Sequence, residues 1–140
     1  MINIVIKENI TPNIKELVEL YNDAGWINYT NNCNQLKTAF DNSLNVISAW
    51  DSQRLVGLIR VVGDGCTIVY IQDILVLKEY QRQTIGTKLM KQLLLKYVDV
   101  RQKVLMTDNQ PETIAFYRSN GFVPTEEYNG VAFVSYNINK

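Results

Sequence analysis

Hydrophobic and polar positions along the chain repeat with two different periods. Residues 2 to 6 alternate well enough between apolar and polar side chains to predict a first strand. Residues 11 to 21 predict a helix, with Thr11 as N-cap and Pro12 at the first helical position. The buried stripe expected of this helix consists of Ile14, Leu17, Val18 and Tyr21.

The middle of the chain changes from helical to strand-like spacing. Residues 24 to 32 carry aromatic side chains and predict a loop or a broken helix, and residues 33 to 40 predict a short second helix. Residues 45 to 50, 54 to 62 and 66 to 77 then predict three strands in hairpin succession. The turns between them read Asp-Ser-Gln and Gly-Asp-Gly.

The second half of the chain alternates strands and helices. Helices are predicted over residues 84 to 98 and 111 to 120, the latter with Pro111 at its start and Gly121 at its C-terminal cap. Residues 103 to 107, 121 to 125 and 131 to 138 predict strands. The order β-α-α-β-β-β-α-β-α-β-β indicates an α/β fold with a mixed sheet, and the lack of linkers or repeats predicts a single domain over residues 1 to 140.

Composition narrows the function further. The 140 residues carry 14 basic and 14 acidic side chains, so the net charge is zero, and no basic stripe favours nucleic-acid binding. No apolar run reaches the roughly 18 residues that a membrane span needs. The first ten residues lack the features of a signal peptide, so we expect a cytoplasmic protein.

The chain has no histidine, which excludes several chemistries at once. Ser-His and Cys-His nucleophiles, imidazole metal ligands and histidine acid–base catalysis are all ruled out. The two cysteines, Cys33 and Cys66, lie in unrelated contexts and argue against a disulfide framework or a zinc site. Any proton transfer therefore falls to Asp, Glu, Tyr, Lys, Cys or ordered water.

Residues 81 to 87, Gln-Arg-Gln-Thr-Ile-Gly-Thr, join a predicted strand to a predicted helix and have no acidic side chain. The first amides of a helix lack intrahelical partners and carry a partial positive charge, so such a turn can hold a phosphate or pyrophosphate. The turn is not a P-loop, because the order is Gly86-Thr87-Lys88, and its single glycine does not match the dinucleotide fingerprint.

The stretch VLKEYQRQTIGTKLM resembles the acetyl-CoA-binding motif of the GNAT family of N-acetyltransferases, with core pattern Gln/Arg-x-x-Gly-x-Gly/Ala. Gln81 takes the first place and Gly86 the last. A second motif of that family, a late helix with a phrase like FYxxxGF, is matched by AFYRSNGF at residues 115 to 122. The resemblance extends from residue 1 to about residue 138 and implies the GNAT fold, transfer of acetyl from acetyl-CoA to an amine, and no metal.

The resemblance also implies a set of cofactor contacts. The backbone of the strand before the turn is expected to hold the pantetheine arm, and the turn itself the pyrophosphate. The implied residues are Ile74, Leu75, Val76, Gln81, Arg82, Gln83, Thr84, Ile85, Gly86, Thr87, Asn109 and Tyr117. Thr84 replaces the family's first glycine, and a β-branched residue is costly at positive φ. Either residue 84 is already helical or the turn is looser than usual.

Tyr117 aligns with the family tyrosine that often protonates the leaving thiolate, and Asp73 is the only acid on the strand where relatives often carry the base. A water chain that takes the amine proton is an equal alternative to Asp73. Gln72 stands where some relatives carry Glu and cannot act as a base. Strand alternation places Tyr70 and Gln72 on one face and Asp73 on the other, unless a bulge intervenes.

The acceptor pocket is expected to include Trp26 and Tyr29 from the first helix pair, which usually forms a lid in this family, together with Tyr70 and Gln72. Trp50 is expected in the core instead. The predicted function is acetylation of a primary amine, most simply a small molecule, by direct attack. Two alternatives stay open: acetylation of protein lysines or N-termini, and a non-catalytic acyl-CoA-binding sensor. A homodimer is compatible with all three of these functions.

Overall fold

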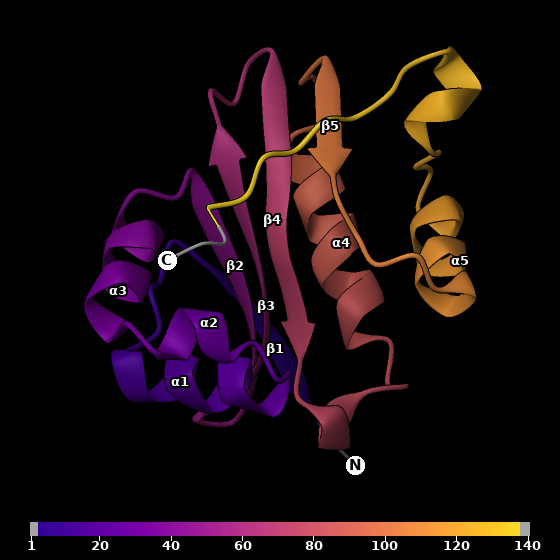
Figure 1. Cartoon of the computed structure of the whole chain (residues 1–140). Helices are drawn as coiled ribbons and strands as arrows, with labels where there is room; N and C mark the ends of the chain where they lie inside the picture. The colour runs from indigo at the N-terminus through magenta and orange to yellow at the C-terminus, as the bar shows by residue number, and fades with distance from the viewer. Residues whose placement is uncertain (1–2, 138–140) are drawn as a thin grey trace. The chain divides into compact units, whose positions relative to one another are not determined.

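The computed structural model describes residues 3–137, which form two compact units that meet in sequence between Met106 and Thr107. The described part of the first unit contains a five-stranded sheet in the order β1-β2-β3-β4-β5 (Figure 1). Its strands are β1 (Ile4–Glu8), β2 (Asn45–Asp51), β3 (Arg54–Gly63), β4 (Ile68–Val76) and β5 (Gln102–Leu105). The first four pair antiparallel and β5 pairs parallel to β4, which confirms the predicted mixed sheet.

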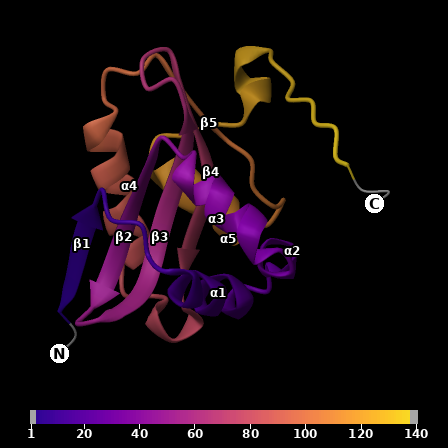
Figure 2. The same cartoon turned by 90° about the vertical axis from the view of Figure 1, so that its left-hand side faces the viewer.

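Helices cover both faces of this sheet. The first three helices, α1 (Ile14–Asp23), α2 (Ile27–Thr30) and α3 (Cys33–Asp41), lie on one face, and α4 (Ile85–Lys96) lies on the other (Figures 1 and 2). A short 3₁₀ turn, η1 (Lys78–Tyr80), follows β4. Helices α1, α3 and α4 each bury one apolar stripe, whereas α2 has no buried residue. The buried members are Leu17, Leu20, Tyr21, Leu36, Phe40, Ile85, Leu89, Met90 and Leu93.

The helix α1 begins two residues later than predicted. Its N-cap is Asn13, whose Oδ1 accepts from the Glu16 amide at 2.9 Å, while Glu16 Oε1 accepts from the Asn13 amide at 2.9 Å. This reciprocal pair satisfies two amides of the first turn, an advantage that Thr11 does not have with Ile14 three positions on. The predicted N-cap at Thr11 is therefore wrong.

An extra residue interrupts β4 at Gln72. Arg60 of β3 pairs with Asp73, but the next β3 residue, Val61, pairs with Ile71, so Gln72 has no partner of its own in that ladder. A bulge of this kind breaks the simple alternation of side chains. Gln72 and Asp73 both contact Tyr29 of α2, so they face the same helices. The sequence predicted opposite faces for Gln72 and Asp73 unless a bulge intervened. The bulge is present, and the two side chains do not lie on opposite faces.

The second unit contains α5 (Pro111–Ser119) and a 3₁₀ turn, η2 (Thr125–Tyr128). Pro111 at the start of α5 is confirmed, and Gly121 has φ +91° just past the helix end. The two strands predicted over residues 121 to 125 and 131 to 138 are absent from the described residues. Pro124 lacks a ladder donor, and alternating side chains make a strand only beside a hydrogen-bonded neighbour. Ile138 lies outside the described residues.

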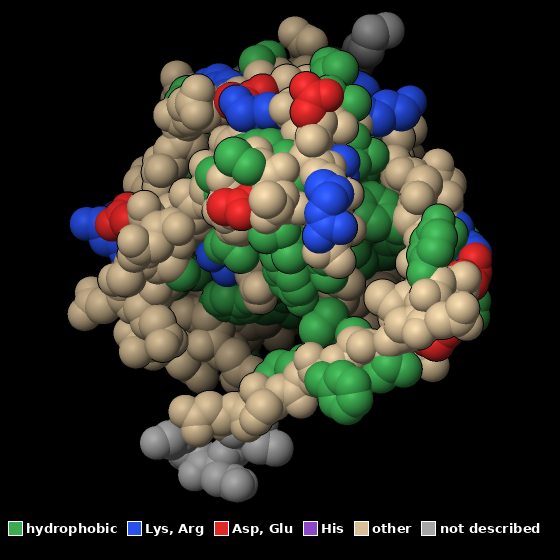
Figure 3. Space-filling view, turned by 90° about the horizontal axis from the view of Figure 1, so that it is seen from above, with side chains coloured by type: hydrophobic (Ala, Val, Ile, Leu, Met, Phe, Trp, Pro, Cys, Tyr) green, Lys and Arg blue, Asp and Glu red, His purple; other side chains and the backbone are tan. Residues whose placement is uncertain are grey.

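Surface charge is mixed. On the face seen in Figure 3, basic and acidic side chains are interspersed, in keeping with the balance of 14 and 14 in the whole sequence. Within residues 3–137, no helix is both long enough and apolar enough to cross a membrane.

Candidate active site

One edge of β4 is open along half its length. Strand β5 pairs with Ile68–Ile71 only and ends at Leu105, so the edge of β4 from Gln72 onward has no strand beside it among the described residues. Backbone groups on such an edge can accept an extended ligand as an added strand. This is the stretch, Ile74, Leu75 and Val76, for which the sequence predicted contact with a pantetheine arm.

The turn that follows β4 is held by its own side chains. Gln81 Nε2 donates to the carbonyl oxygen of Val76 at 3.1 Å, which ties the start of the turn to the end of the open edge. Arg82 and Thr84 both take positive φ, at +66° and +63°. These conformations are costly for residues with a Cβ, and backbone strain of this kind gathers at ligand-binding turns.

The amides of residues 82 to 87 have no acceptor within residues 3–137. Helices α1 and α3 contrast with α4 in this respect, because the side chains of Asn13 and Asn32 cap their N-termini. At α4 the N-cap Thr84 makes no such bond, because its Oγ1 donates to the carbonyl of Gln83 at 2.6 Å. Its first turn also has no acidic side chain. Consecutive unpaired amides at a helix N-terminus form an electropositive surface suited to a phosphate.

The backbone conformation of Thr84 tests the two alternatives for this position, a helix that already includes residue 84 or a looser turn. With φ +63° and ψ +15°, Thr84 lies in the left-handed region and not in the right-handed helix. The first alternative, that residue 84 is already helical, is therefore wrong. The chain keeps the backbone conformation suited to a glycine while it carries a β-branched residue there.

Asp73 lies at the centre of a buried polar cluster. Its carboxylate accepts from Arg60 Nε at 2.8 Å, from Tyr21 Oη at 2.8 Å and from Tyr29 Oη at 2.9 Å. Asp73 is 2% exposed and Arg60 5% exposed. Burial is the largest single influence on the pKa of Arg60 and lowers it, but the charge and hydrogen bond of Asp73, together with the two tyrosines, raise that pKa overall. The cluster joins β3, β4, α1 and α2.

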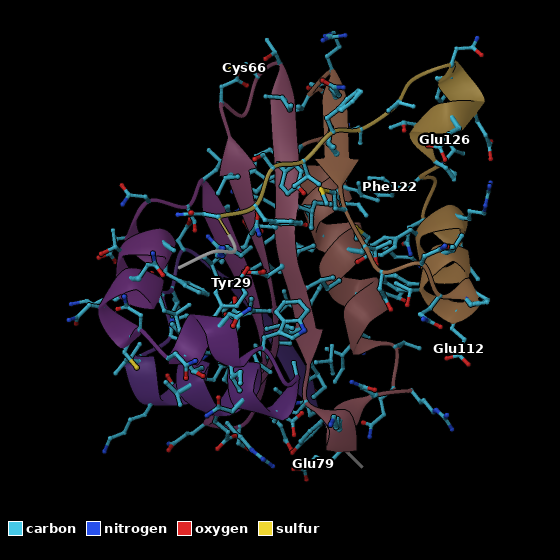
Figure 4. The ribbon with its side chains drawn as sticks, in the orientation of Figure 1. Tyr29, Cys66, Glu79, Glu112, Phe122 and Glu126 are labelled. Atoms are coloured by element: carbon cyan, nitrogen blue, oxygen red, sulfur yellow. The ribbon has the colours of Figure 1, made fainter. Side chains whose placement is uncertain are left out.

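Tyr29 connects this cluster to the surface. Its side chain points from α2 toward the sheet (Figure 4), where its hydroxyl contacts Asp73 and also accepts from Gln72 Nε2 at 3.3 Å. Burial and the adjacent Asp73 charge raise the pKa of Tyr29, so its phenol stays protonated at neutral pH. The exposed side chain of Gln72 lies at the head of the open edge of β4.

The sequence interpretation missed Arg60 and Tyr21. Arg60 stands in the apolar run Leu-Val-Gly-Leu-Ile-Arg-Val-Val, just as Asp73 stands in Ile-Gln-Asp-Ile-Leu-Val. A lone cation and a lone anion on adjacent strands of one hairpin were a readable signal, because each needs a buried partner.

The remaining aromatic candidates separate clearly. Trp26 is 37% exposed and stacks on Tyr29 with ring centroids 6.0 Å apart, beside the Tyr29–Gln72 contact. Trp50 is buried in the core as predicted, with its Nε1 donating to Ser48 Oγ at 2.8 Å. Tyr70, two residues before Gln72 on β4, is half-buried.

The second unit carries the last two candidates. Tyr117 lies on α5, packed edge-on against Phe116 and Phe122 with centroids 5.2 and 6.2 Å away. Burial raises the pKa of Tyr117, while a hydrogen bond with the Thr107 side chain lowers it by a smaller amount. Asn109 precedes the helix by two residues. Their predicted roles, like those of the other site residues, stay predictions.

Comparison with known proteins places the whole arrangement in context. Residues 10–140 match a family model described as an acetyltransferase (GNAT) domain. The chain is 32% identical over 129 residues to an uncharacterized N-acetyltransferase, ycf52-like, from Prochlorococcus marinus, and the match covers 88% of this chain and 69% of the relative.

Solved structures share the fold. A GNAT-family acetyltransferase from Streptococcus pneumoniae is 35% identical with a TM-score of 0.87, over 98% of this chain and all of the other. A PaiA N-acetyltransferase from Thermoplasma acidophilum, solved in complex with coenzyme A, has a TM-score of 0.70 at 17% identity, over 86% of this chain and 90% of its own. At that identity the second likeness concerns the fold alone.

Thr84→Gly is expected to stabilise the protein. Glycine removes a left-handed strain of about 1–2 kcal/mol and adds about 0.5–1 kcal/mol of unfolded-state entropy, so the net gain lies between about 0 and 1.5 kcal/mol. The matched control is Thr87→Gly, in the first turn of α4, which gains no such relief and should lose about 0.3 kcal/mol, the difference between the helix propensities of threonine and glycine. Urea unfolding measures both, and equal losses in the two variants would contradict the prediction.

Asp73→Asn is expected to destabilise the fold by about 3–5 kcal/mol, because Arg60 would keep a buried charge without its counter-charge. Glu19→Gln is the control, because it breaks an ion pair between Glu19 and Arg54 at the surface. The Glu19 side chain is 55% exposed and the Arg54 side chain 42%, and such exposed pairs contribute about 0–1 kcal/mol to the free energy of unfolding. Equal unfolding midpoints for the two variants would show that the cluster is not the strong contact described above.

Proposed function

Because the chain belongs to the GNAT family of N-acetyltransferases, we propose that it transfers the acetyl group of acetyl-CoA to a small primary amine by direct attack. The observation that carries this proposal is the run of unpaired amides over residues 82 to 87, next to the open edge of β4. A pyrophosphate on those amides directs the pantetheine arm along Ile74–Val76. The thioester then lies near Gln72.

The reaction needs few groups from the protein. The amine nitrogen forms a bond to the thioester carbonyl carbon, the C–S bond breaks, the nitrogen gives up one proton and the thiolate gains one. Asp73 is a poor base for that proton, since Arg60 and two tyrosines already occupy its carboxylate. Of the two open alternatives we favour ordered water as the proton acceptor, with Asp73 as the group that positions Tyr29.

Tyr117 is the proposed acid. Its raised pKa keeps the phenol protonated at neutral pH, and a protonated phenol is the form that can serve a thiolate. The contacts proposed for the acceptor amine come from Trp26 and Gln72, with Tyr29 held behind them by Asp73. An aminoglycoside acetyltransferase solved in complex with sisomicin has a TM-score of 0.71 at 19% identity, so a protein of this fold binds a small molecule.

The test of this function is thiol release from acetyl-CoA with a panel of amines: benzylamine, spermidine, sisomicin and a lysine peptide. We expect turnover with at least one small amine and little with the peptide. Turnover of the peptide alone would favour the protein-acetylating alternative. Binding of acetyl-CoA without turnover of any amine would favour the sensor alternative and contradict the proposal.

Tyr117→Phe is expected to lower kcat about 100-fold at neutral pH while the affinity for acetyl-CoA is retained, because the hydroxyl acts only on the late thiolate. Phenolic protonation is lost as pH rises through a pKa that lies above the ordinary value of about 10. The wild-type rate should therefore fall only beyond that pH, and the variant should lack this alkaline limb.

Tyr128→Phe is the matched control, since Tyr128 belongs to the same unit and is 80% exposed. It should retain the wild-type rate. A kcat within about twofold of wild type for Tyr117→Phe would remove Tyr117 from the mechanism and leave the thiolate's proton to solvent.

A further inference from the structure

The hydrogen bonds around Asp73 have only one consistent direction. The Arg60 guanidinium can only donate, and the Asp73 carboxylate accepts from it at 2.8 Å. A carboxylate in a buried ion pair is an acceptor only, so the hydroxyl of Tyr29, 2.9 Å from Oδ1, must give its single hydrogen to Asp73. The same holds for Tyr21 on the other oxygen.

The direction of the Tyr29 hydrogen bond also fixes the orientation of the Gln72 amide. Once its hydrogen is committed, the Tyr29 oxygen can only accept, so the atom of Gln72 that lies 3.3 Å away must be the amide nitrogen. The amide carbonyl oxygen is then turned away from Tyr29. Gln72 Oε1 has no donor among the described residues 3–137, and the side chain is exposed. The buried ion pair thereby sets the orientation of a surface acceptor.

The bulge gives this acceptor its location. Gln72 is the extra residue of β4 and stands where β5 pairing stops, directly before the open edge of Ile74–Val76. Trp26, stacked on Tyr29 with an interplanar angle of 29°, provides a partly exposed aromatic surface beside it. The carboxylate of the next residue, Asp73, has its charge compensated by Arg60. The surface around Gln72 therefore offers an aromatic ring from Trp26 and one acceptor atom, Gln72 Oε1. Asp73 adds no uncompensated negative charge to it.

We propose that Gln72 Oε1 accepts an N–H of the acceptor amine and directs its lone pair at the thioester, and that Tyr29 is a positioning residue acting through Gln72. This inference rests on the proposed acetyl transfer. A neutral carbonyl oxygen holds an uncharged amine without stabilising its ammonium form as a carboxylate does. The site therefore takes a primary monoamine on an apolar or aromatic body, which packs on Trp26, in preference to a polycationic amine.

The kinetic test uses benzylamine as the probe and spermidine as its polycationic counterpart. The wild type is expected to show the higher kcat/KM with benzylamine. Gln72→Met, similar in size but without the acceptor, should raise the KM for benzylamine about tenfold and leave the KM for acetyl-CoA unchanged. A higher kcat/KM for spermidine, or an unchanged benzylamine KM in this variant, would overturn the proposal.

A double-mutant cycle separates positioning from support. Tyr29→Phe keeps the ring against Trp26 and Tyr21 and should raise the benzylamine KM about threefold, because Gln72 loses its orienting contact. In the Gln72→Met background the same change should add nothing, since there is no amide left to orient. A purely structural Tyr29 predicts the same factor in both backgrounds, and that result would contradict the proposed relay.

A measurement without substrate keeps the two proposals distinguishable. In the free protein, the side-chain amide protons of Gln72 should give a distinct NMR pair that moves toward the unstructured position in Tyr29→Phe. If that pair is insensitive to Tyr29→Phe, the relay is wrong even in an active enzyme. If the relay is present but no amine is acetylated, the proposed function fails, and with it the role of Gln72.

Discussion

Asp73 forms an ion pair with Arg60 in the middle of a sheet and is 2% exposed, and a carboxylate is tolerated there only when donors surround it. Those donors come from three directions: Arg60 from the neighbouring strand, Tyr21 from α1 and Tyr29 from α2. Arg60 extends the network to α3, where Ser43 Oγ accepts at 3.2 Å just beyond the helix end. The need to satisfy one carboxylate therefore fixes the helices on this face of the sheet to β3 and β4.

The bulge at Gln72 and the open edge beyond it follow from the same strand. With Arg60 paired to Asp73 and Val61 paired to Ile71, the surplus residue has to leave the ladder, and it does so where β5 has just stopped pairing. The buried side chain of Asp73 in β4 therefore has all its hydrogen-bond donors, whereas the backbone at the edge of β4 from Gln72 onward has no neighbouring strand among the described residues. The turn beyond it, with unpaired amides over residues 82 to 87 and strain at Arg82 and Thr84, continues that unsatisfied edge to the start of α4. Groups left without partners in the fold are the ones available to a ligand.

Local patterns in the sequence predicted most of the fold because they act over a few residues. The helix at Pro111, the hairpin strands and the turn before Gly86 all follow from spacing and backbone chemistry. For Thr84 the sequence left two alternatives, a helix that already includes residue 84 and a looser turn, and the left-handed backbone excludes the first. The α1 cap was misplaced because a capping box at Asn13 competes with Pro12 at the first helical position.

What the sequence did not reveal depends on contacts between distant segments. The bulge at Gln72 is a matter of register between two strands, so no pattern within β4 specifies it. The partnership of Arg60 and Asp73 needed the hairpin register, although both charges stood out in apolar runs. The final two predicted strands had suitable side chains, but a strand also needs a neighbour, and residues 131–137 have none in a ladder among the described residues.

The most direct test of the central claim, that the unpaired amides at the start of α4 hold the pyrophosphate of acetyl-CoA, is amide hydrogen exchange resolved by residue. In the free protein the amides of residues 82 to 87 should exchange fast, because they have no acceptor within the described chain. Saturating acetyl-CoA should protect this run strongly, while S-acetylpantetheine, which lacks the pyrophosphate, should leave it unprotected. Protection elsewhere in the chain, with residues 82 to 87 still exchanging fast in the presence of bound acetyl-CoA, would contradict the claim.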